Sequence, residues 1–249
     1  AFSAHIQKDP SQFVRHDIVD KVLLRDLPSL YGISDVQELN SLFTMIAYHS
    51  GMEFSYDGMS KESGVKKETI RRYIQYLEAA FLIKVVNKTD DTARRFQRQT
   101  TFKIYLTNPS LRCALFEPVK MTDGNIGDMI ETAVYSQWIP RDERIAYANW
   151  KIGRTQGEVD LVGINDALQK PSWAVEVKWT DRFFDRPSES SSLKYFMEKN
   201  HLSQALVTTI GQRGRKDMDF GTLHFIPSAC YAYTVGENTL RQAKRSFGL

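Results

Sequence analysis

Two short segments in which apolar and charged residues alternate constrain the fold of this chain most strongly. They are GEVDLVGI, residues 157–164, and WAVEVKW, residues 173–179. Because successive side chains of a β-strand point to opposite faces, Glu158 and Asp160 should share one face of the first strand, and Glu176 and Lys178 one face of the second. If the two strands form a hairpin, Asp160 can approach Glu176.

These residue types match the groups that metal-dependent phosphodiester hydrolysis requires. Carboxylate oxygens hold Mg²⁺ or Mn²⁺, the metal activates water, and a nearby cation stabilises developing charge. We therefore expect Asp160 and Glu176 to hold the metal and Lys178 to assist the reaction, with the carbonyl of Val177 as a further ligand. An acidic-x-Lys triplet alone is more often a solvated strand face. The neighbouring Asp160 is what favours a catalytic site.

Glu131 is a further candidate for this site. It lies on or beside the inward face of an amphipathic helix predicted between Ile126 and Trp138. A buried carboxylate needs a partner, which a metal or Lys178 would provide. Glu131 is therefore predicted to be an auxiliary metal ligand or base. The alternative is a partly exposed residue at the edge of the apolar stripe.

The first part of the chain favours helices followed by a hairpin. Helical periodicity is predicted over residues 13–31, 36–51 and 67–80. Ser60 can cap a short helix before the turn at Gly64. Strand-like segments at 82–86 and 102–106 flank a polar stretch that suits a wing. This order predicts a winged helix-turn-helix.

Two clusters of basic residues in this part could contact DNA phosphates. The predicted recognition helix carries Lys66, Lys67, Arg71 and Arg72. The predicted wing carries Arg94, Arg95, Arg98 and Lys103. Charged residues also occupy the solvated face of any helix, and winged helices also bind proteins. DNA is the preferred partner, and a protein partner stays open.

The second part is predicted to be a sheet with covering helices. Strand-like segments occur at 144–148, 159–164, 173–179, 205–210, 223–226 and 231–235, and a helical segment at 190–200. We place a helical lead-in at 1–37, a winged-helix domain at 38–108 and an α/β domain at 109–249. The fold class is mixed α/β.

Composition limits the remaining possibilities. The two cysteines, Cys113 and Cys230, suggest neither a disulfide framework nor a zinc site, so a reducing, cytoplasmic compartment is expected. No segment suits a signal peptide or a membrane span, and no phosphate-binding loop for ATP is present. The net charge of +3 is too small to indicate nucleic acid by itself.

The strand motifs resemble those of the PD-(D/E)XK phosphodiesterase superfamily. Its pattern is an acidic residue on one strand and an acidic-x-Lys triplet on the next, often with a Glu from the preceding helix. Asp160, Glu176, Lys178 and Glu131 match in that order, although Val159 stands where the superfamily's name has Pro. The resemblance implies a restriction-endonuclease-like α/β domain with a mixed central sheet.

The helix-turn-helix together with GDMIETAV, GEVDLV and AVEVKW is also similar to the C-terminal region of prokaryotic AAA-type ATPases that carry the domain of unknown function DUF4143. That similarity implies an N-terminal P-loop domain, absent from these residues, which alone would bind ATP. The preferred hypothesis is a DNA-associated, metal-dependent nuclease or nuclease-like domain. The alternative is a non-catalytic module that couples a DNA or protein partner to the ATPase domain.

Overall fold

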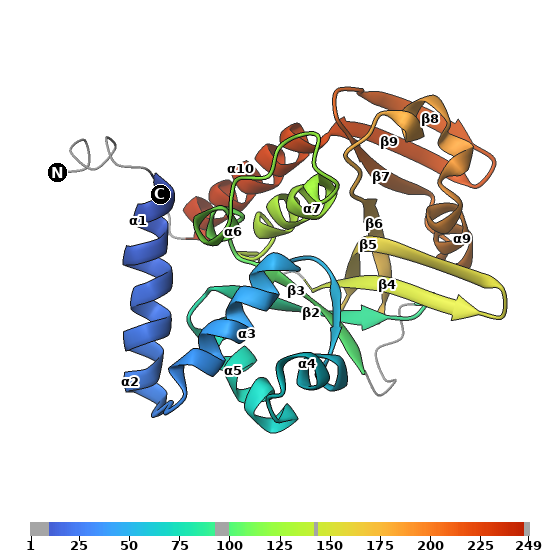
Figure 1. Cartoon of the computed structure of the whole chain (residues 1–249). Coiled ribbons are helices and arrows are strands. Elements are labelled where there is room, and N and C mark those ends of the chain that lie inside the picture. Colours follow the sequence, from blue (N-terminus) through green and yellow to red (C-terminus); the bar gives the residue numbers. More distant parts are fainter. Residues whose placement is uncertain (1–9, 93–99, 142–143, 247–249) are drawn as a thin grey trace. The chain divides into compact units, whose positions relative to one another are not determined.

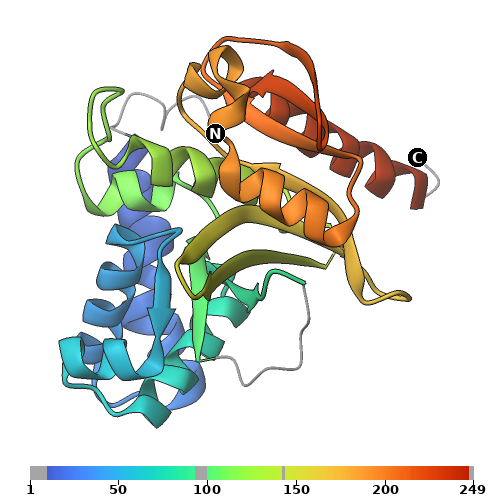
Figure 2. The ribbon, with the colours of Figure 1, turned by 90° about the vertical axis from the view of Figure 1, so that its right-hand side faces the viewer.

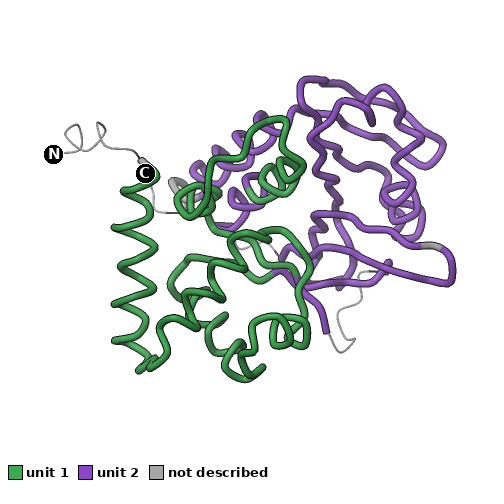
Figure 3. Tube along the Cα trace, in the orientation of Figure 1, with its two compact units in different colours: residues 1–85, 103–132 green, residues 86–102, 133–249 purple. Residues whose placement is uncertain are grey.

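Contacts within the chain divide it into two units. The computed structural model describes residues 10–92, 100–141 and 144–246 and is mixed α/β, as predicted (Figure 1). Unit 1 comprises residues 1–85 and 103–132, and unit 2 comprises residues 86–102 and 133–249 (Figure 3). These bounds differ from the three sequence-based domains, which stay a prediction.

Unit 1 begins with a helical segment that buries one narrow stripe. Its elements are α1 (Pro10–Phe13), η2 (Val14–Asp20), η3 (Val22–Asp26) and α2 (Leu27–Tyr31). Val19, Leu23 and Leu27 recur every four residues and are all buried, which is the spacing of one helix face. The segment ends at Gly32, whose φ of 62° is the left-handed conformation that glycine adopts without strain.

After this segment the chain alternates helices with three strands, and β2, β3 and α7 each include residues of both units. In chain order these elements are α3 (Val36–Tyr48), β1 (Glu53–Ser55), α4 (Tyr56–Ser63), α5 (Lys67–Ala79), β2 (Ile83–Thr89), β3 (Thr101–Leu106), α6 (Ser110–Leu115) and α7 (Ile126–Ser136). The strands are ordered β1-β3-β2. The predicted strand pair before residue 107 is confirmed. The short helix α6 lies in a stretch for which no element was predicted.

The caps of α4 correct one detail of the sequence analysis. Ser55, not Ser60, caps this helix, because the Ser55 hydroxyl accepts a hydrogen bond from the amide of Gly58 at 3.0 Å. Ser60 lies inside the helix, where its hydroxyl donates to the carbonyl of Val65 at 2.7 Å. Gly64 ends the helix with a φ of 73°, as the predicted turn requires.

Unit 2 is organised by a mixed sheet with the strand order β2-β4-β5-β6-β7-β9-β8. The strands are β4 (Ile145–Ile152), β5 (Thr155–Asn165), β6 (Lys170–Glu176), β7 (Gln204–Thr209), β8 (Gly214–Met218) and β9 (Gly221–Pro227). Strands β4, β5 and β6 form an antiparallel meander, whereas β6 pairs with β7, and β7 with β9, in parallel. The expectation of a mixed sheet is confirmed.

The helices of unit 2 follow β6 and β9. They are α8 (Arg182–Asp185), the 3₁₀ turn η4 (Pro187–Glu189), α9 (Ser191–Asn200) and α10 (Ser228–Ser246). Helix α9 connects the parallel strands β6 and β7 and packs along β5, β6 and β7 (Figure 2). It inserts Leu193, Phe196 and Met197 into a core cluster that includes Val207 and Phe225. Burial of these large side chains fixes the sheet that carries the candidate site.

Two elements of unit 2 differ from the sequence-based expectation. Residues 231–235 were predicted to be a strand, but they lie inside α10. Tyr231 and Val235 are both buried, whereas Tyr233, which would share their face in a strand, is exposed, so the burial pattern is that of a helix. Strand β8, GRKDM, was missed because its residues are mostly polar, so the sequence shows no alternation of apolar and polar residues although their burial alternates. In the part of the chain that the structure describes, no helix is both long and apolar enough to cross a bilayer.

Candidate active site

The β5–β6 hairpin brings the predicted acidic residues together. The two strands are antiparallel, and Leu161 pairs with Val175 and Val162 with Ala174. The next position along this register sets Asp160 across from Glu176, where side chains are nearest neighbours. The predicted approach of these two carboxylates through a hairpin is therefore confirmed.

Strand β5 carries an irregularity at Asp160 on its other side. Ala148 of β4 pairs with Val159, but Ala146 pairs with Val162, so two residues of β5 stand opposite the single residue between them. Val159 and Val162 consequently contribute to the same core cluster although they are three residues apart. Uninterrupted alternation, as we predicted it for residues 157–164, does not hold here. Bulges of this kind redirect side chains and are common beside active sites.

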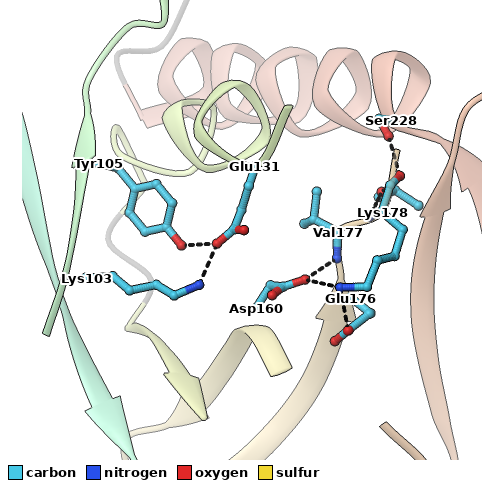
Figure 4. A network of polar contacts seen from close by, with 9 residues as sticks. Lys103, Tyr105, Glu131, Asp160, Glu176, Val177, Lys178 and Ser228 are labelled. Carbon is cyan, nitrogen blue, oxygen red and sulfur yellow. Dashed lines mark hydrogen bonds and ion pairs between the residues drawn. The ribbon is translucent and has the colours of Figure 1, made fainter. Parts of the chain in front are cut away.

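Lys178 lies between the two carboxylates. Its Nζ is 2.7 Å from Glu176 Oε1 and 3.4 Å from Asp160 Oδ2 (Figure 4). Asp160 Oδ2 also accepts a hydrogen bond from the amide of Val177 at 2.7 Å. The side chains of Asp160, Glu176 and Lys178 are 7%, 12% and 30% exposed. The site is thus largely desolvated, and Lys178 is its most exposed side chain.

Glu176 is in an unfavourable environment for a charged carboxylate. Burial, and then the neighbouring charge of Asp160, raise the pKa of Glu176 to about 8, while Lys178 opposes the shift and Glu158 adds slightly to it. The buried Oε2 of Glu176 has no hydrogen-bond partner among the described residues. A buried carboxylate oxygen of this kind suits a cation. The carboxylates of Asp160 and Glu176 are therefore chemically suited to Mg²⁺ or Mn²⁺, which prefer oxygen donors.

Glu131 belongs to unit 1, where it has partners of its own. The Nζ of Lys103 lies 2.8 Å from Glu131 Oε1, and the hydroxyl of Tyr105 donates to the same oxygen (Figure 4). The side chains of Lys103 and Glu131 are 5% and 13% exposed. Lys103 was expected on the surface of the wing, and this expectation was wrong, because its ammonium is buried against Glu131. The role of Glu131 as ligand or base stays a prediction.

The predicted DNA-contacting residues of α5 are at the surface. Lys66, Lys67, Arg71 and Arg72 are all exposed. Lys67 forms an ion pair with Asp57, and Arg71 lies 3.6 Å from Glu68 and 4.8 Å from the centroid of the Tyr56 ring. The wing residues Arg94, Arg95 and Arg98 lie outside the described residues.

Two hydroxyl residues that the sequence analysis did not select also belong to the site. Thr208 and Ser228 hydrogen-bond the backbone of Lys178. Neither has a neighbouring charge or a motif in the sequence that would have marked it. Within residues 10–92, 100–141 and 144–246, no group of three or more His, Cys, Asp or Glu residues is arranged to bind a metal ion.

Comparison with known families corrects the proposed relationship. A family model described as a domain of unknown function (DUF8612) matches residues 1–122. The expected relationship to DUF4143 was therefore wrong, and the expectations drawn only from it, an N-terminal ATPase domain and ATP binding, are not retained. Comparison with curated proteins and with solved structures gave no match.

The environment of Glu176 predicts a pH-dependent cost to stability. Because the pKa of Glu176 is higher in the folded state than in the unfolded state, its carboxyl group contributes stability that is fully present below pH 4.5. This contribution is lost as the pH rises through about 8. Glu176→Gln should therefore become more stable than the wild type as pH rises, by roughly 1.4 kcal/mol or more between pH 5 and pH 8. Urea unfolding across this range measures the difference. A constant difference across these pH values would contradict the assignment, and Glu158→Gln should show a smaller effect.

The buried ion pair in unit 1 predicts a second stability effect. Lys103→Met removes the cation from a buried carboxylate and should lower the free energy of unfolding by roughly 3 kcal/mol, and Glu131→Gln added to it should recover much of that loss. Lys84→Met is the matched control, because Lys84 and Glu78 form a partly exposed pair at 3.9 Å, with side chains 50% and 30% exposed, that should contribute less than about 1 kcal/mol. Equal losses in the two methionine variants would refute the buried pair.

Proposed function

We propose that unit 2 is a metal-dependent phosphodiesterase of the nuclease type, with Asp160 and Glu176 as the metal ligands. The observation that carries the proposal is the buried pair of carboxylates with Lys178 between them. An acidic residue on one strand and an acidic-x-Lys triplet on its antiparallel neighbour is the arrangement that the superfamily resemblance implies. The antiparallel pairing of β5 with β6, within a sheet that also contains parallel pairs, supports that resemblance.

The chain's own groups divide the work of the reaction. Asp160 and Glu176 would hold Mg²⁺ or Mn²⁺, which when bound supplies an activated water and screens the charge of the phosphate. Lys178 is the most exposed of the three side chains, so its ammonium can reach a substrate. There it would orient the attacking water or stabilise the negative charge that develops on the phosphate oxygens. The amide of Val177 fixes the orientation of Asp160.

The substrate we propose is DNA, held in part by unit 1. Support comes from the element order of helix, strand, two helices and two strands, and from the strand order β1-β3-β2, both of which suit a winged helix. Helix α5 would be the recognition helix. Its exposed Lys66, Lys67, Arg71 and Arg72 provide cations for phosphate contacts.

Cleavage assays test the catalytic proposal. We expect the wild-type chain to cleave linear, nicked or single-stranded DNA with Mg²⁺ or Mn²⁺, and Asp160→Asn and Lys178→Ala each to lower the rate at least about 100-fold. Asp219→Asn and Lys194→Ala are matched controls, since they remove the same groups from an exposed ion pair of unit 2 at 3.0 Å. They should cleave at the wild-type rate. Absence of metal-dependent cleavage by the wild type would refute the proposal.

Binding assays test the role of α5 separately. The variants are made in an Asp160→Asn background so that the DNA is not cleaved. Lys66→Gln combined with Arg72→Gln should weaken DNA binding, and the number of phosphate contacts calculated from its salt dependence should fall by about two. Lys21→Gln with Arg25→Gln removes the same charge from another helical segment of unit 1 and should leave the salt slope unchanged. Fluorescence anisotropy at several salt concentrations gives both slopes. Salt-dependent binding by a wild type that does not cleave would favour the alternative, a non-catalytic DNA-binding module.

A further inference from the structure

Lys178 lies beyond the last residue of β6, Glu176, so strand pairing does not hold its backbone. A side chain replaces the missing strand contacts. The Thr208 hydroxyl accepts a hydrogen bond from the amide of Lys178 at 2.8 Å and donates one to the carbonyl of the same residue at 3.0 Å. One hydroxyl thus satisfies both backbone polar groups of Lys178.

Ser228, the first residue of α10, holds the same carbonyl from a second element. Its hydroxyl is 3.3 Å from the carbonyl oxygen of Lys178 (Figure 4). It is also 3.0 Å from the carbonyl oxygen of Thr209. Thr208 is 0% and Ser228 2% exposed. Water therefore cannot readily replace either hydroxyl, and loss of one would leave a buried backbone group without its partner.

The position of this backbone determines where the ammonium of Lys178 can go. A lysine side chain is a flexible four-carbon stem, so its cation is placed only as well as its base is held. From this anchored base, Nζ reaches both Glu176 and Asp160. The preceding amide, that of Val177, meanwhile orients Asp160. Anchoring the backbone at Lys178 therefore aligns a cation and a carboxylate together.

We propose that Thr208 is a positioning residue of the candidate active site, with Ser228 in support, and that it acts through Lys178. This inference rests on the proposed phosphodiester hydrolysis, because it assigns Thr208 to the same site. Thr208 is 0% exposed, so it has no surface with which to contact a substrate directly. Its hydroxyl holds the Lys178 backbone so that the ammonium stays beside the two carboxylates.

The adjacent threonine provides a matched control. Thr209 is also 0% exposed, but its hydroxyl donates to the carbonyl of Gln212 and not to Lys178. Thr208→Val and Thr209→Val each replace a buried hydroxyl with a methyl group of similar size on the same strand. A difference between the two variants therefore reports the contact with Lys178 and not the loss of a buried hydroxyl in general.

The first arm of the experiment compares cleavage rates. Thr208→Val should lower kcat roughly 10- to 100-fold, the range typical for residues that orient an active-site group, with little change in KM. Thr208→Ser, which keeps the hydroxyl, should retain most of the activity, and Thr209→Val should resemble the wild type. In a Lys178→Ala background, Thr208→Val should cause a clearly smaller loss, because the cation it positions is gone and only the alignment of Asp160 through the amide of Val177 can still be disturbed. Equal losses with and without Lys178 would overturn the inference.

The second arm does not depend on cleavage. Hydrogen exchange of the Lys178 amide should become roughly five- to tenfold faster in Thr208→Val and stay unchanged in Thr209→Val, since only the first loses its acceptor. If the wild type does not cleave DNA but this difference appears, the proposed function fails and the anchoring of Lys178 stands. If the wild type cleaves and Thr208→Val matches it in both rate and exchange, the positioning role is refuted and the nuclease proposal stands.

Discussion

The packing of two carboxylates against each other in a poorly solvated part of the sheet is the constraint on which the candidate site depends. Asp160 and Glu176 are both mostly buried, and their like charges repel. The ammonium of Lys178 and the backbone amide of Val177 offset this cost in the folded state. Neither compensating group would be in place if the segment after β6 were loose. The candidate site therefore requires that the segment after β6 be well ordered. Glu176 lowers the stability of the protein, and such a cost is typical of groups that are retained for function.

The sequence was sufficient for the parts of this arrangement that depend on local periodicity. Alternation in WAVEVKW predicted Glu176 and Lys178 on one face, and Asp160 was expected beside Glu176 on the condition that the two segments form a hairpin, which the structure contains. Helix α5 was also predictable, because its apolar residues recur at helical spacing and glycine marks the turn before it. The strands β2 and β3 were predictable because β-branched and aromatic residues are concentrated in them. In each case the information lies within a few residues of the element itself.

Features that depend on distant partners could not be predicted in this way. Lys103 has the sequence context of an exposed wing residue, and only its contact with Glu131, in a helix later in the chain, shows that it is buried. The aromatic and β-branched residues 231–235 favour a strand locally, yet packing against the sheet places them in α10. Thr208 looks like any strand threonine until its partner on Lys178 is known. Similarity of short motifs was also a poor guide to family, since the family model that matches is another one.

The bulge in β5 has a consequence for how this site can vary among sequences. Between Val159 and Val162 the strand carries one residue more than β4 does over the same stretch. Removing a single residue there would restore even pairing with β4, but it would shift every following side chain of β5 to the opposite face relative to β6. Substitutions around Asp160 preserve the spacing of the two carboxylates, whereas a one-residue deletion does not. The site therefore depends on how many residues separate Val159 from Val162 as much as on which residues they are.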